Sequence, residues 1–445
     1  MDEREAIAID FAQRAVESAL ESGADEAEAT CSISRKFRSE ARDRTITKLE
    51  QSVGRSLSLR VFVQQAKAAS VCTDFSDEAV RAVARAAVDG ARYVAPDSFA
   101  GLPETTRPDQ VDLGIAAEDV KNFPSEQKVN DALELERDVR ACDARIVNSG
   151  GSNIGDSDSV IAVVSSRGFA GAYRSTSAWR STEPIAADGE HLRPGSHASA
   201  ARSYGALESL DFIARKAVRR AVEMFGARRP PTSRVPVIFE RDVAASVLSD
   251  LFVSVNASSV VIGDSFLSGK IGEHIGSDLV TIVDDGRLYA GLGSSPFDSE
   301  GVPTRRTTVF ERGVFRSHLA DTYYARKLGM KSTANAAGGG IGPNNFFLEP
   351  GRGSLEEIIA STPRGLLVLG TLGFANEHVS GNYSRGAHGF WIENGELAYP
   401  VDEFTIAGNL ATMLGSIDAV AADLLFDSSI VSPSFRVAEM TVSGG

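Results

Sequence analysis

The histidines are the first residues to test for chemistry, because they are the commonest ligands of a catalytic zinc ion. A zinc peptidase helix needs two histidines about one turn apart, with a glutamate that activates the bound water. The sequence holds six histidines, and no pair has that spacing: His191, His197, His274, His318, His378 and His388. A metal site assembled from distant segments, for example Glu377, His378 and His388, remains an alternative.

A nucleophilic site is the second possibility. The sequence has no Gly-x-Ser-x-Gly turn, and no cysteine has the histidine context of a catalytic thiol. Ser384 lies four residues before His388, and this spacing puts both on one face of a strand. No carboxylate is evident to orient His388, so a structural or substrate-lining role is the simpler interpretation.

Three further patterns have simple structural interpretations. Asp284 and Asp285 could bind a divalent cation, but Asp-Asp-Gly after a strand is typical of a turn. The glycine run 338–340 lacks the Lys-Ser/Thr of a phosphate loop and is predicted to be a flexible loop. The cysteines form no Cys-x-x-Cys pair and are expected to be small buried residues in a reducing compartment: Cys31, Cys72 and Cys142.

Composition excludes several classes of protein. The 445 residues are 42% hydrophobic and 24% charged, as in ordinary globular proteins. The net charge of −14 argues against direct binding of nucleic acid, which needs a basic face. No apolar run approaches ~20 residues, and the charged N-terminus lacks the apolar core of a signal peptide. We therefore expect a cytoplasmic protein without a membrane span.

The elements that would position these residues fall into two groups. Helix signals occupy residues 3–22, 77–93, 125–143 and 207–226, with Gly23 and Ser76 as expected caps. Strand signals lie between them at residues 57–63 and 160–164. After a proline-rich boundary at 227–236, the sequence favours short β runs, with helix signals at 241–255, 319–328 and 354–361.

Later strands are expected at residues 280–286, 309–314 and 366–369, and Asn394-Gly395 is expected to join two more. The prediction is an α+β fold of two domains. Residues 1–228 would form an α/β N-terminal domain. Residues 229–445 would form a β-rich C-terminal domain with mostly antiparallel sheets.

The most specific sequence motif lies at residues 381–395, GNYSRGAHGFWIENG, and continues to residue 410. This stretch closely resembles the TldD/PmbA family, and in particular its PmbA (TldE) branch. Other segments match in the same order along the chain: 265–272, 281–285, 324–330, 365–368 and 440–445.

In the TldD branch, as the resemblance implies, an HExxxH helix and a later cysteine bind zinc and cleave unfolded peptides. Counting back without gaps from residues 268–273 places that helix at 248–253. The three key positions are Leu248, Ser249 and Val253, none of which can ligate zinc or act as the base. The later cysteine is missing too. The resemblance thus implies no metal and no catalytic residue in this chain, with zinc in a TldD-like partner.

The resemblance also implies how such a chain works. PmbA-like chains resemble the non-catalytic half of a heterodimer with a TldD-like subunit, which encloses a proteolytic chamber for extended peptides. The complex is associated with trimming a microcin precursor, with degrading an antitoxin and with the label "modulator of DNA gyrase". The candidate peptide-binding residues are Asn376, Glu377, His378, Ser380, Asn382, Tyr383, Ser384 and His388. The alternative is that these residues only build turns of the fold.

Two other functions remain open. One is a stand-alone binding or regulatory homodimer linked to gyrase or toxin–antitoxin proteins. The other is an independent hydrolase with an unrecognised site around His378 and His388.

Overall fold

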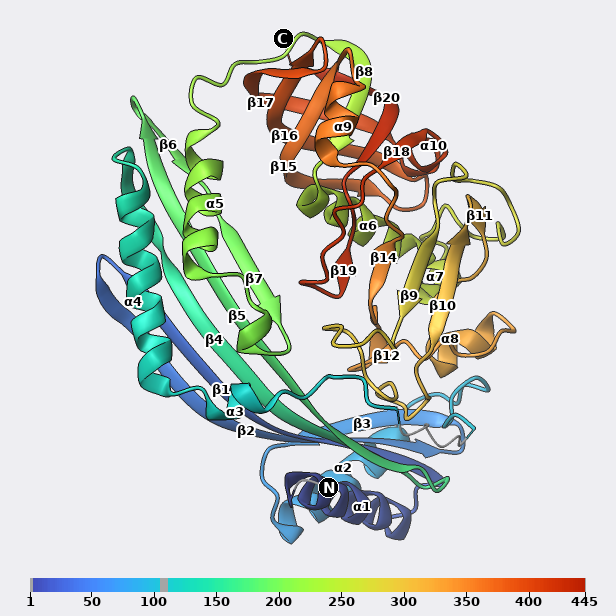
Figure 1. The fold of residues 1–445 in the computed structure, drawn as a ribbon. Coiled ribbons are helices and arrows are strands. Elements are labelled where there is room, and N and C mark those ends of the chain that lie inside the picture. The colour runs from blue at the N-terminus through green and yellow to red at the C-terminus, as the bar shows by residue number, and fades with distance from the viewer. Residues whose placement is uncertain (1–2, 105–110, 445) are drawn as a thin grey trace.

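The computed structural model describes residues 3–104 and 111–444. A long curved sheet in the N-terminal part (Glu3–Val222) bends around one side of the C-terminal part (Ser233–Ser443), as Figure 1 shows. The α+β class with mostly antiparallel sheets is confirmed. The division into domains at residues 228 and 229 stays a prediction.

One antiparallel sheet holds every strand of the N-terminal part that the structure describes. Its order is β3-β2-β1-β4-β5-β6, and β7 also pairs with β5. The strands are β1 (Glu26–Arg42), β2 (Thr45–Val63), β3 (Ala66–Cys72), β4 (Ile146–Ser165), β5 (Ala170–Asp188), β6 (His191–Pro194) and β7 (His197–Ala201). The predicted strands at 57–63 and 160–164 are therefore correct but cover only the apolar ends of β2 and β4.

Helices cover one face of this sheet. Along β4, Ile154, Val160 and Ala162 face the helices, because alternate residues of a strand point to opposite faces. The helices α1 and α2 pack at one end of the sheet and α4 and α5 at the other. They are α1 (Glu3–Glu21), α2 (Asp77–Ala91), α3 (Glu118–Asn122), α4 (Ser125–Cys142) and α5 (Leu210–Val222), with a 3-10 turn η1 (Tyr204–Ala206).

The predicted ends of these helices have physical causes. Gly23 has a φ of 102° after α1, and the Ser76 side chain accepts a hydrogen bond from the backbone N–H of Ala79 at the start of α2. The helix expected at 207–226 is shorter, because Ser209 caps it and α5 ends at Val222.

The C-terminal part contains a sheet that closes on itself. Its order is β17-β16-β15-β8-β20-β18, and β17 also pairs with β20 through Thr405–Ala407. The contact of β8 with β15 is parallel. The strands are β8 (Ser233–Phe239), β15 (Arg364–Glu377), β16 (Asn382–Glu393), β17 (Glu396–Asn409), β18 (Ile417–Val420) and β20 (Phe435–Ser443). Asn394 and Gly395 form the predicted turn between β16 and β17, both at positive φ.

A second sheet lies nearer the N-terminal part, in the order β11-β10-β9-β14-β19. Its strands are β9 (Ile282–Asp285), β10 (Arg306–Glu311), β11 (Val314–Phe315), β14 (Phe346–Leu348) and β19 (Ile430–Val431), and β12 (Ala336–Ala337) pairs separately with β13 (Gly340–Ile341). The helices are α6 (Arg241–Val255), α7 (Ala257–Ile262), α8 (Thr322–Lys327), α9 (Leu355–Ala360) and α10 (Leu410–Gly415). One apolar core joins both sheets to α6, which packs against β8, β14, β15 and β19.

Three local predictions were wrong. Asp284 and Asp285 do not form a turn, because both lie in β9 and Asp284 is fully buried. Its carboxylate accepts hydrogen bonds from the backbone and side chain of Asn344 and from the side chain of Asn335. Residues 338 and 339 form the tight turn between β12 and β13, where positive φ requires glycine. Cys31 is buried as expected, whereas Cys72 is only half-buried and Cys142 is exposed.

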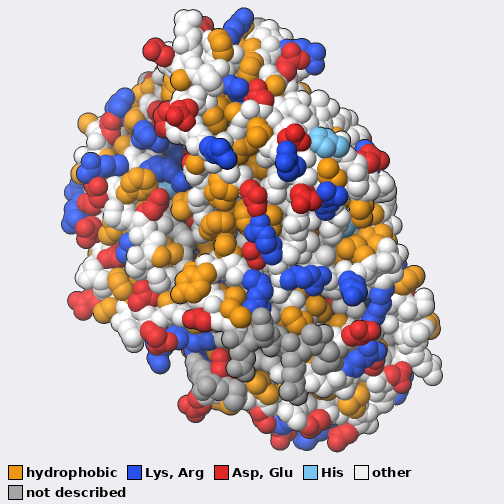
Figure 2. All heavy atoms as spheres, turned by 45° about the vertical axis from the view of Figure 1, so that its right-hand side comes forward, with side chains coloured by type: hydrophobic (Ala, Val, Ile, Leu, Met, Phe, Trp, Pro, Cys, Tyr) orange, Lys and Arg blue, Asp and Glu red, His pale blue; other side chains and the backbone are white. Residues whose placement is uncertain are grey.

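No helix in the described ranges has the length and hydrophobicity needed to cross a membrane. On the face drawn in Figure 2, acidic and basic side chains are interspersed.

Candidate functional site

Two cavities separate the open face of the N-terminal sheet from the C-terminal part. The first, of about 620 Å³, lies between β4, β5 and β7 on one side and α6 with residues 425–432 on the other. We call it the α6 cavity. The second, of about 690 Å³, lies between β1 to β5 and the loops 293–299 and 335–344. We call it the Glu28 cavity.

The helix α6 has two different faces. Its cavity face carries Asp242, Ala245 and Ser249, at intervals of three and four residues. Its opposite face carries Val247, Leu248 and Leu251, which are buried in the apolar core. The 3.6-residue period of the helix produces this division between a buried face and a cavity face.

The three positions of the implied zinc motif do not converge on one point. Leu248 is 2% exposed and packs in the core, whereas Ser249 lines the α6 cavity. The Ser249 hydroxyl donates a hydrogen bond to the carbonyl of Ala245 at 3.0 Å, and Val253 is half-buried. Two hydrocarbon side chains and one hydroxyl do not fit zinc. Within residues 3–104 and 111–444, no group of three or more His, Cys, Asp or Glu side chains could hold a metal ion.

Charges at the rim of the α6 cavity are paired. Arg220 of α5 forms an ion pair with Asp242 and donates a hydrogen bond to the carbonyl of Ser196 at 3.0 Å. Burial favours a raised pKa for Asp242, but the hydrogen bond and charge of Arg220 lower it. Glu240 caps α6 by accepting a hydrogen bond from the backbone N–H of Asp242 at 3.0 Å. The rim is thus a fixed ion-pair network that joins α5 to α6.

Of the six histidines, His197 on β7 is the one that lines the α6 cavity. Its Nε2 lies 2.6 Å from a carboxylate oxygen of Glu208, and burial and the charge of Lys216 lower its pKa against the effect of Glu208. In the described part of the chain, no histidine side chain is hydrogen-bonded to a serine, threonine or cysteine side chain. The cavity offers hydroxyl and amide groups for binding, without a nucleophile and base in contact.

The predicted peptide-binding segment runs from the end of β15 through the turn at residues 378–381 into β16. Glu377 accepts hydrogen bonds from the Ser380 hydroxyl at 2.6 Å and the Asn382 amide at 3.1 Å, and these lower its pKa. The carbonyl of His378 accepts a hydrogen bond from the backbone N–H of Phe266 at 2.9 Å. The side chain of Asn376 lies outside the described part. None of the predicted residues is among those lining either cavity.

Beyond this turn, β16 is attached to α6. Arg385 donates two hydrogen bonds to the carboxylate of Asp250, at 2.8 and 2.9 Å. Tyr383 is 1% exposed beside this ion pair, and burial together with the charge of Asp250 raises its pKa. Tyr383 therefore belongs to the core, and the segment carries both surface and core positions.

Ser384 and His388 are both half-buried on β16, and no hydrogen bond joins them. The pairing of β16 with β17 shifts register between Ala387 and Gly389, directly at His388. The imidazole packs over Gly370, where an added Cβ would lie 2.1 Å from its Cε1. Burial lowers the pKa of His388, and the charge of Asp402 opposes this. This geometry gives no support to a Ser384–His388 catalytic pair.

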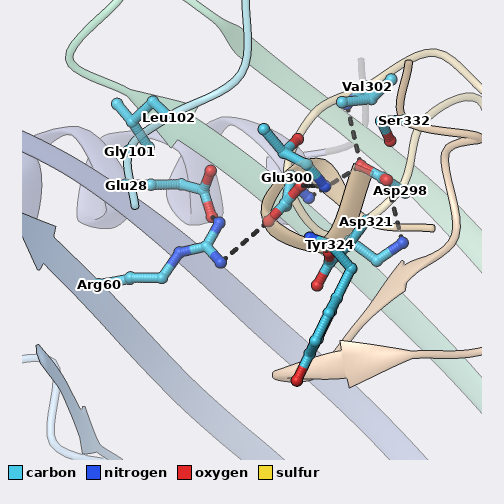
Figure 3. A network of polar contacts seen from close by, with 12 residues as sticks. Glu28, Arg60, Gly101, Leu102, Asp298, Glu300, Val302, Asp321, Tyr324 and Ser332 are labelled. Carbon is cyan, nitrogen blue, oxygen red and sulfur yellow. Dashed lines mark hydrogen bonds and ion pairs between the residues drawn. The ribbon is translucent and has the colours of Figure 1, made fainter. Parts of the chain in front are cut away.

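An arginine-centred contact at the Glu28 cavity was not predicted. Arg60 of β2 donates hydrogen bonds to Glu28 at 2.9 Å and to Glu300 of the C-terminal part at 3.0 Å, and Figure 3 shows it between them. The other oxygen of Glu300 accepts from the backbone N–H of Thr322 at 2.9 Å. Asp298 lies on the side of Glu300 away from Arg60. It accepts hydrogen bonds from three backbone N–H groups, those of Glu300, Val302 and Ala336.

Burial raises the pKa of two of these acids into the neutral range. The pKa of Glu28 rises to about 7, mainly by burial and against the charge of Arg60. The pKa of Asp298 rises to about 8, by burial and by the charge of Glu300. Charged residues at inward-facing strand positions, such as Glu28 between Ala27 and Ala29, are the signal in the sequence that could have found this network.

A second arginine joins the two parts without any carboxylate. Arg202 is 7% exposed and donates to the carbonyls of Gly291, Leu292 and Ser294 in the C-terminal part. It also donates to the carbonyl of Thr176 and the hydroxyl of Ser175. Burial lowers its pKa to about 10.

Sequence comparison identifies the family. The family described as PmbA/TldA metallopeptidase matches in three segments: domain 1 at residues 27–91, the central domain at 118–225 and the C-terminal domain at 232–444. The chain belongs to the PmbA/TldD family. Metalloprotease PmbA of Escherichia coli O157:H7 is 34% identical over 394 residues, covering 87% of this chain and 86% of the relative.

Solved structures agree with this PmbA/TldD membership. A protein of Bacteroides thetaiotaomicron named as a modulator of DNA gyrase superposes with a TM-score of 0.92 at 27% identity, over 100% of both chains. TldE of Thermococcus kodakarensis has the same fold, with a TM-score of 0.89 at 24% identity over 98% of this chain and 100% of TldE. The resemblance to the PmbA (TldE) branch is thus confirmed. At the three positions of the implied zinc motif on α6, this chain carries no side chain that binds zinc.

Proposed function

We propose that this chain is a non-catalytic subunit that shapes the peptide-binding chamber of a TldD-type zinc protease, with the zinc held by a TldD-like partner. The main support for the proposal is the set of side chains that α6 presents to the cavity. This helix presents Ala245, Ser246 and Ser249 to the cavity, and it buries Leu248 in the core. Residues of these types can line a chamber, but they cannot bind zinc or activate water.

The walls of the α6 cavity support binding of an extended peptide. Among the described strands, β7 pairs only with β5, and β19 pairs only with β14, so each has one free edge. Residues of both strands line the cavity, including Ala200 and Ile430. A peptide can add to such an edge through main-chain hydrogen bonds that do not depend on its side chains. Trimming of a microcin precursor and degradation of an antitoxin would both need this tolerance.

The segment from Asn376 to His388 contains a turn whose polar side chains are hydrogen-bonded to each other. Glu377 accepts hydrogen bonds from Ser380 and Asn382. We propose that it contacts the peptide or the partner only through its exposed turn, whereas Tyr383 supports β16 from the core. A hydrolase centred on His388 has less support, because its ring packs against Gly370.

The test is peptide cleavage by the isolated chain, by an isolated TldD-like chain and by the mixture. We expect the isolated chain to be inactive and the mixture to be the most active. Ser249→Trp fills the cavity from an exposed helix position and should lower cleavage by the mixture at least tenfold. Thr412→Trp, on the exposed side of α10, is the matched control and should change nothing.

Two outcomes count against the proposal. Cleavage by the isolated chain would show a catalytic site that the α6 residues do not explain. A mixture no more active than the TldD-like chain alone would favour a stand-alone regulatory homodimer, especially if gyrase or toxin–antitoxin proteins co-purify with the chain.

A further inference from the structure

The Glu28 cavity contains a buried carboxylate with one oxygen that has no partner. Glu28 is 4% exposed, and its Oε1 accepts a hydrogen bond from Arg60 at 2.9 Å. Within the described part of the chain, its Oε2 accepts no hydrogen bond. Figure 3 shows this oxygen directed away from Arg60. Buried polar atoms in folded proteins are nearly always paired, so this oxygen needs a donor that the chain itself does not supply.

The charges around the cavity favour a cation over an anion. Two carboxyl groups line it, those of Glu28 and Asp298, and Arg60 is the one basic side chain among the described residues of its wall. Arg60 also pairs with Glu300 at 3.0 Å, so one guanidinium is shared by two carboxylates. A further positive charge in the cavity would therefore lie beside an excess of acidic groups, whereas an anion would be repelled by them.

The donors of the chain restrict the kind of cation. In residues 3–104 and 111–444, no group of three or more His, Cys, Asp or Glu side chains could hold a metal ion, so an organic cation fits better. A guanidinium binds best to both oxygens of a carboxylate, but one oxygen of Glu28 is already held by Arg60. An ammonium group is a compact donor that needs only the other oxygen.

The rest of the wall fits an alkyl chain that ends in an ammonium group. Val71, Ile161 and Phe297 line the cavity with apolar surface, and Ser58 adds a hydroxyl acceptor. The rings of Tyr173 and Phe297 pack edge to face with their centroids 5.2 Å apart, and the face of such a ring attracts an ammonium ion. The volume of about 690 Å³ is within the range of small-molecule sites.

We propose that the Glu28 cavity binds the ammonium group of an alkylamine, which donates a hydrogen bond to Oε2 of Glu28. A lysine side chain of a peptide and a free aliphatic diamine share this chemistry. The inference goes beyond the proposed function, because the site needs neither zinc nor peptide cleavage. Failure of one would leave the other untouched.

Binding should depend on pH, because the ammonium group and a proton compete for Glu28. Burial raises the pKa of Glu28 to about 7, and an ammonium ion beside the carboxylate would lower it. The amine itself stays charged up to about pH 10. Raising the pH from 6 to 8 should therefore strengthen binding about tenfold. The other charged or titratable groups around this contact are Arg60 on β2, Lys67 on β3, Asp298 and Glu300 between β9 and β10, and Asp321 before α8.

Isothermal titration calorimetry of the full chain tests the site with two probes, cadaverine and a capped tripeptide with lysine between two glycines. We expect saturable binding of at least one probe. The same tripeptide with norleucine in place of lysine keeps the alkyl chain without the ammonium group and should not bind. Tighter binding of cadaverine would assign the site to a free amine, and tighter binding of the lysine peptide would assign it to a peptide side chain.

Two pairs of variants locate the site. Glu28→Gln removes the acceptor charge and should weaken binding by about tenfold or more. Glu50→Gln, at an exposed acid on the same face of the sheet, is its control. Ser58→Lys places the chain's own ammonium group in the cavity and should also abolish binding. Ser52→Lys, at an exposed position on the same face of β2 and outside the cavity, is the matched control.

Unchanged circular dichroism spectra would show that the variants fold. The inference would be overturned if neither probe binds, or if the norleucine peptide binds as tightly as the lysine peptide. It would equally be overturned by an affinity that does not rise from pH 6 to pH 8, or by unaltered binding in both Glu28→Gln and Ser58→Lys.

Discussion

Arg60 and Arg202 both join the N-terminal part to the C-terminal part, but with different acceptors. Arg60 lies between two buried carboxylates, Glu28 and Glu300, whereas Arg202 is surrounded by neutral oxygens. The two contacts therefore differ in how their charges depend on pH. Burial raises the pKa of Glu28 to about 7, so the Arg60 contact titrates in the physiological range. Burial lowers the pKa of Arg202 only to about 10, so Arg202 keeps its charge throughout the physiological range.

The largest effect is expected from Arg202→Met. This change leaves the carbonyls of Gly291, Leu292 and Ser294 buried without their donor. Unsatisfied buried acceptors cannot change protonation to reduce the cost, so we expect a loss of about 3 kcal/mol in the free energy of unfolding. Urea denaturation measures it. Arg215→Met, at an exposed position on α5, is the control and should leave stability unchanged.

Arg60→Met should cost less, and its cost should depend on pH. Near pH 8 the change leaves Glu28 and Glu300 without their cation, and we expect a loss of about 2 kcal/mol. Near pH 5 a protonated Glu28 no longer needs the cation, so the loss should shrink. Denaturation of this variant at both pH values provides the measurement. An equal loss at the two would contradict the distinction between the arginines.

The unmodified chain should itself lose stability as the pH rises. The folded pKa of Glu28, about 7, exceeds its ordinary value of 4.5, and that of Asp298, about 8, exceeds 3.8. The folded state therefore binds these protons more tightly, and their contribution is complete below the ordinary values and lost as the pH passes through the raised ones. Glu28→Gln should flatten the fall in unfolding free energy between pH 5 and pH 8. An equally steep fall in this variant would assign the effect to other groups.

The smallest effect is expected at a third contact between the parts. Arg193 of β6 pairs with Asp402 of β17 at 2.5 Å, with side chains 25% and 22% exposed. Because water and salt screen a partly exposed pair, Arg193→Met should cost less than about 1 kcal/mol. Measurement in low and high salt would sharpen the ranking, since only this pair should weaken markedly with salt.

The sequence predicts best where a pattern is local. The helix expected at 241–255 has those bounds in the structure, because its apolar residues recur at helical intervals and Glu240 caps it. The Asn394-Gly395 turn forms for an equally local reason, since both residues adopt positive φ. The polar half of β4 was missed, because Gly155, Asp156 and Ser157 have low strand propensity and are held by pairing with β1 and β5.

The cavities depend on segments that only the fold brings together. Glu28 and Glu300 lie far apart in the sequence, and no spacing rule relates them. The sequence did identify α6 and its missing ligands, but it could not show that Leu248 points into the core while Ser249 faces a cavity. The predicted segment from Asn376 to His388 overlaps the stretch at 381–395 that resembles the family. Its role in binding peptides stays a prediction.

Zinc content is the most direct test of the central claim. The isolated chain and its complex with a TldD-like partner would be purified in zinc-containing buffer, desalted and analysed by plasma emission. We predict no stoichiometric zinc in the isolated chain and stoichiometric zinc in the complex, with none lost when Ser249→Ala is introduced. Stoichiometric zinc in the isolated chain would contradict the account, because the residues of α6 offer it no ligands.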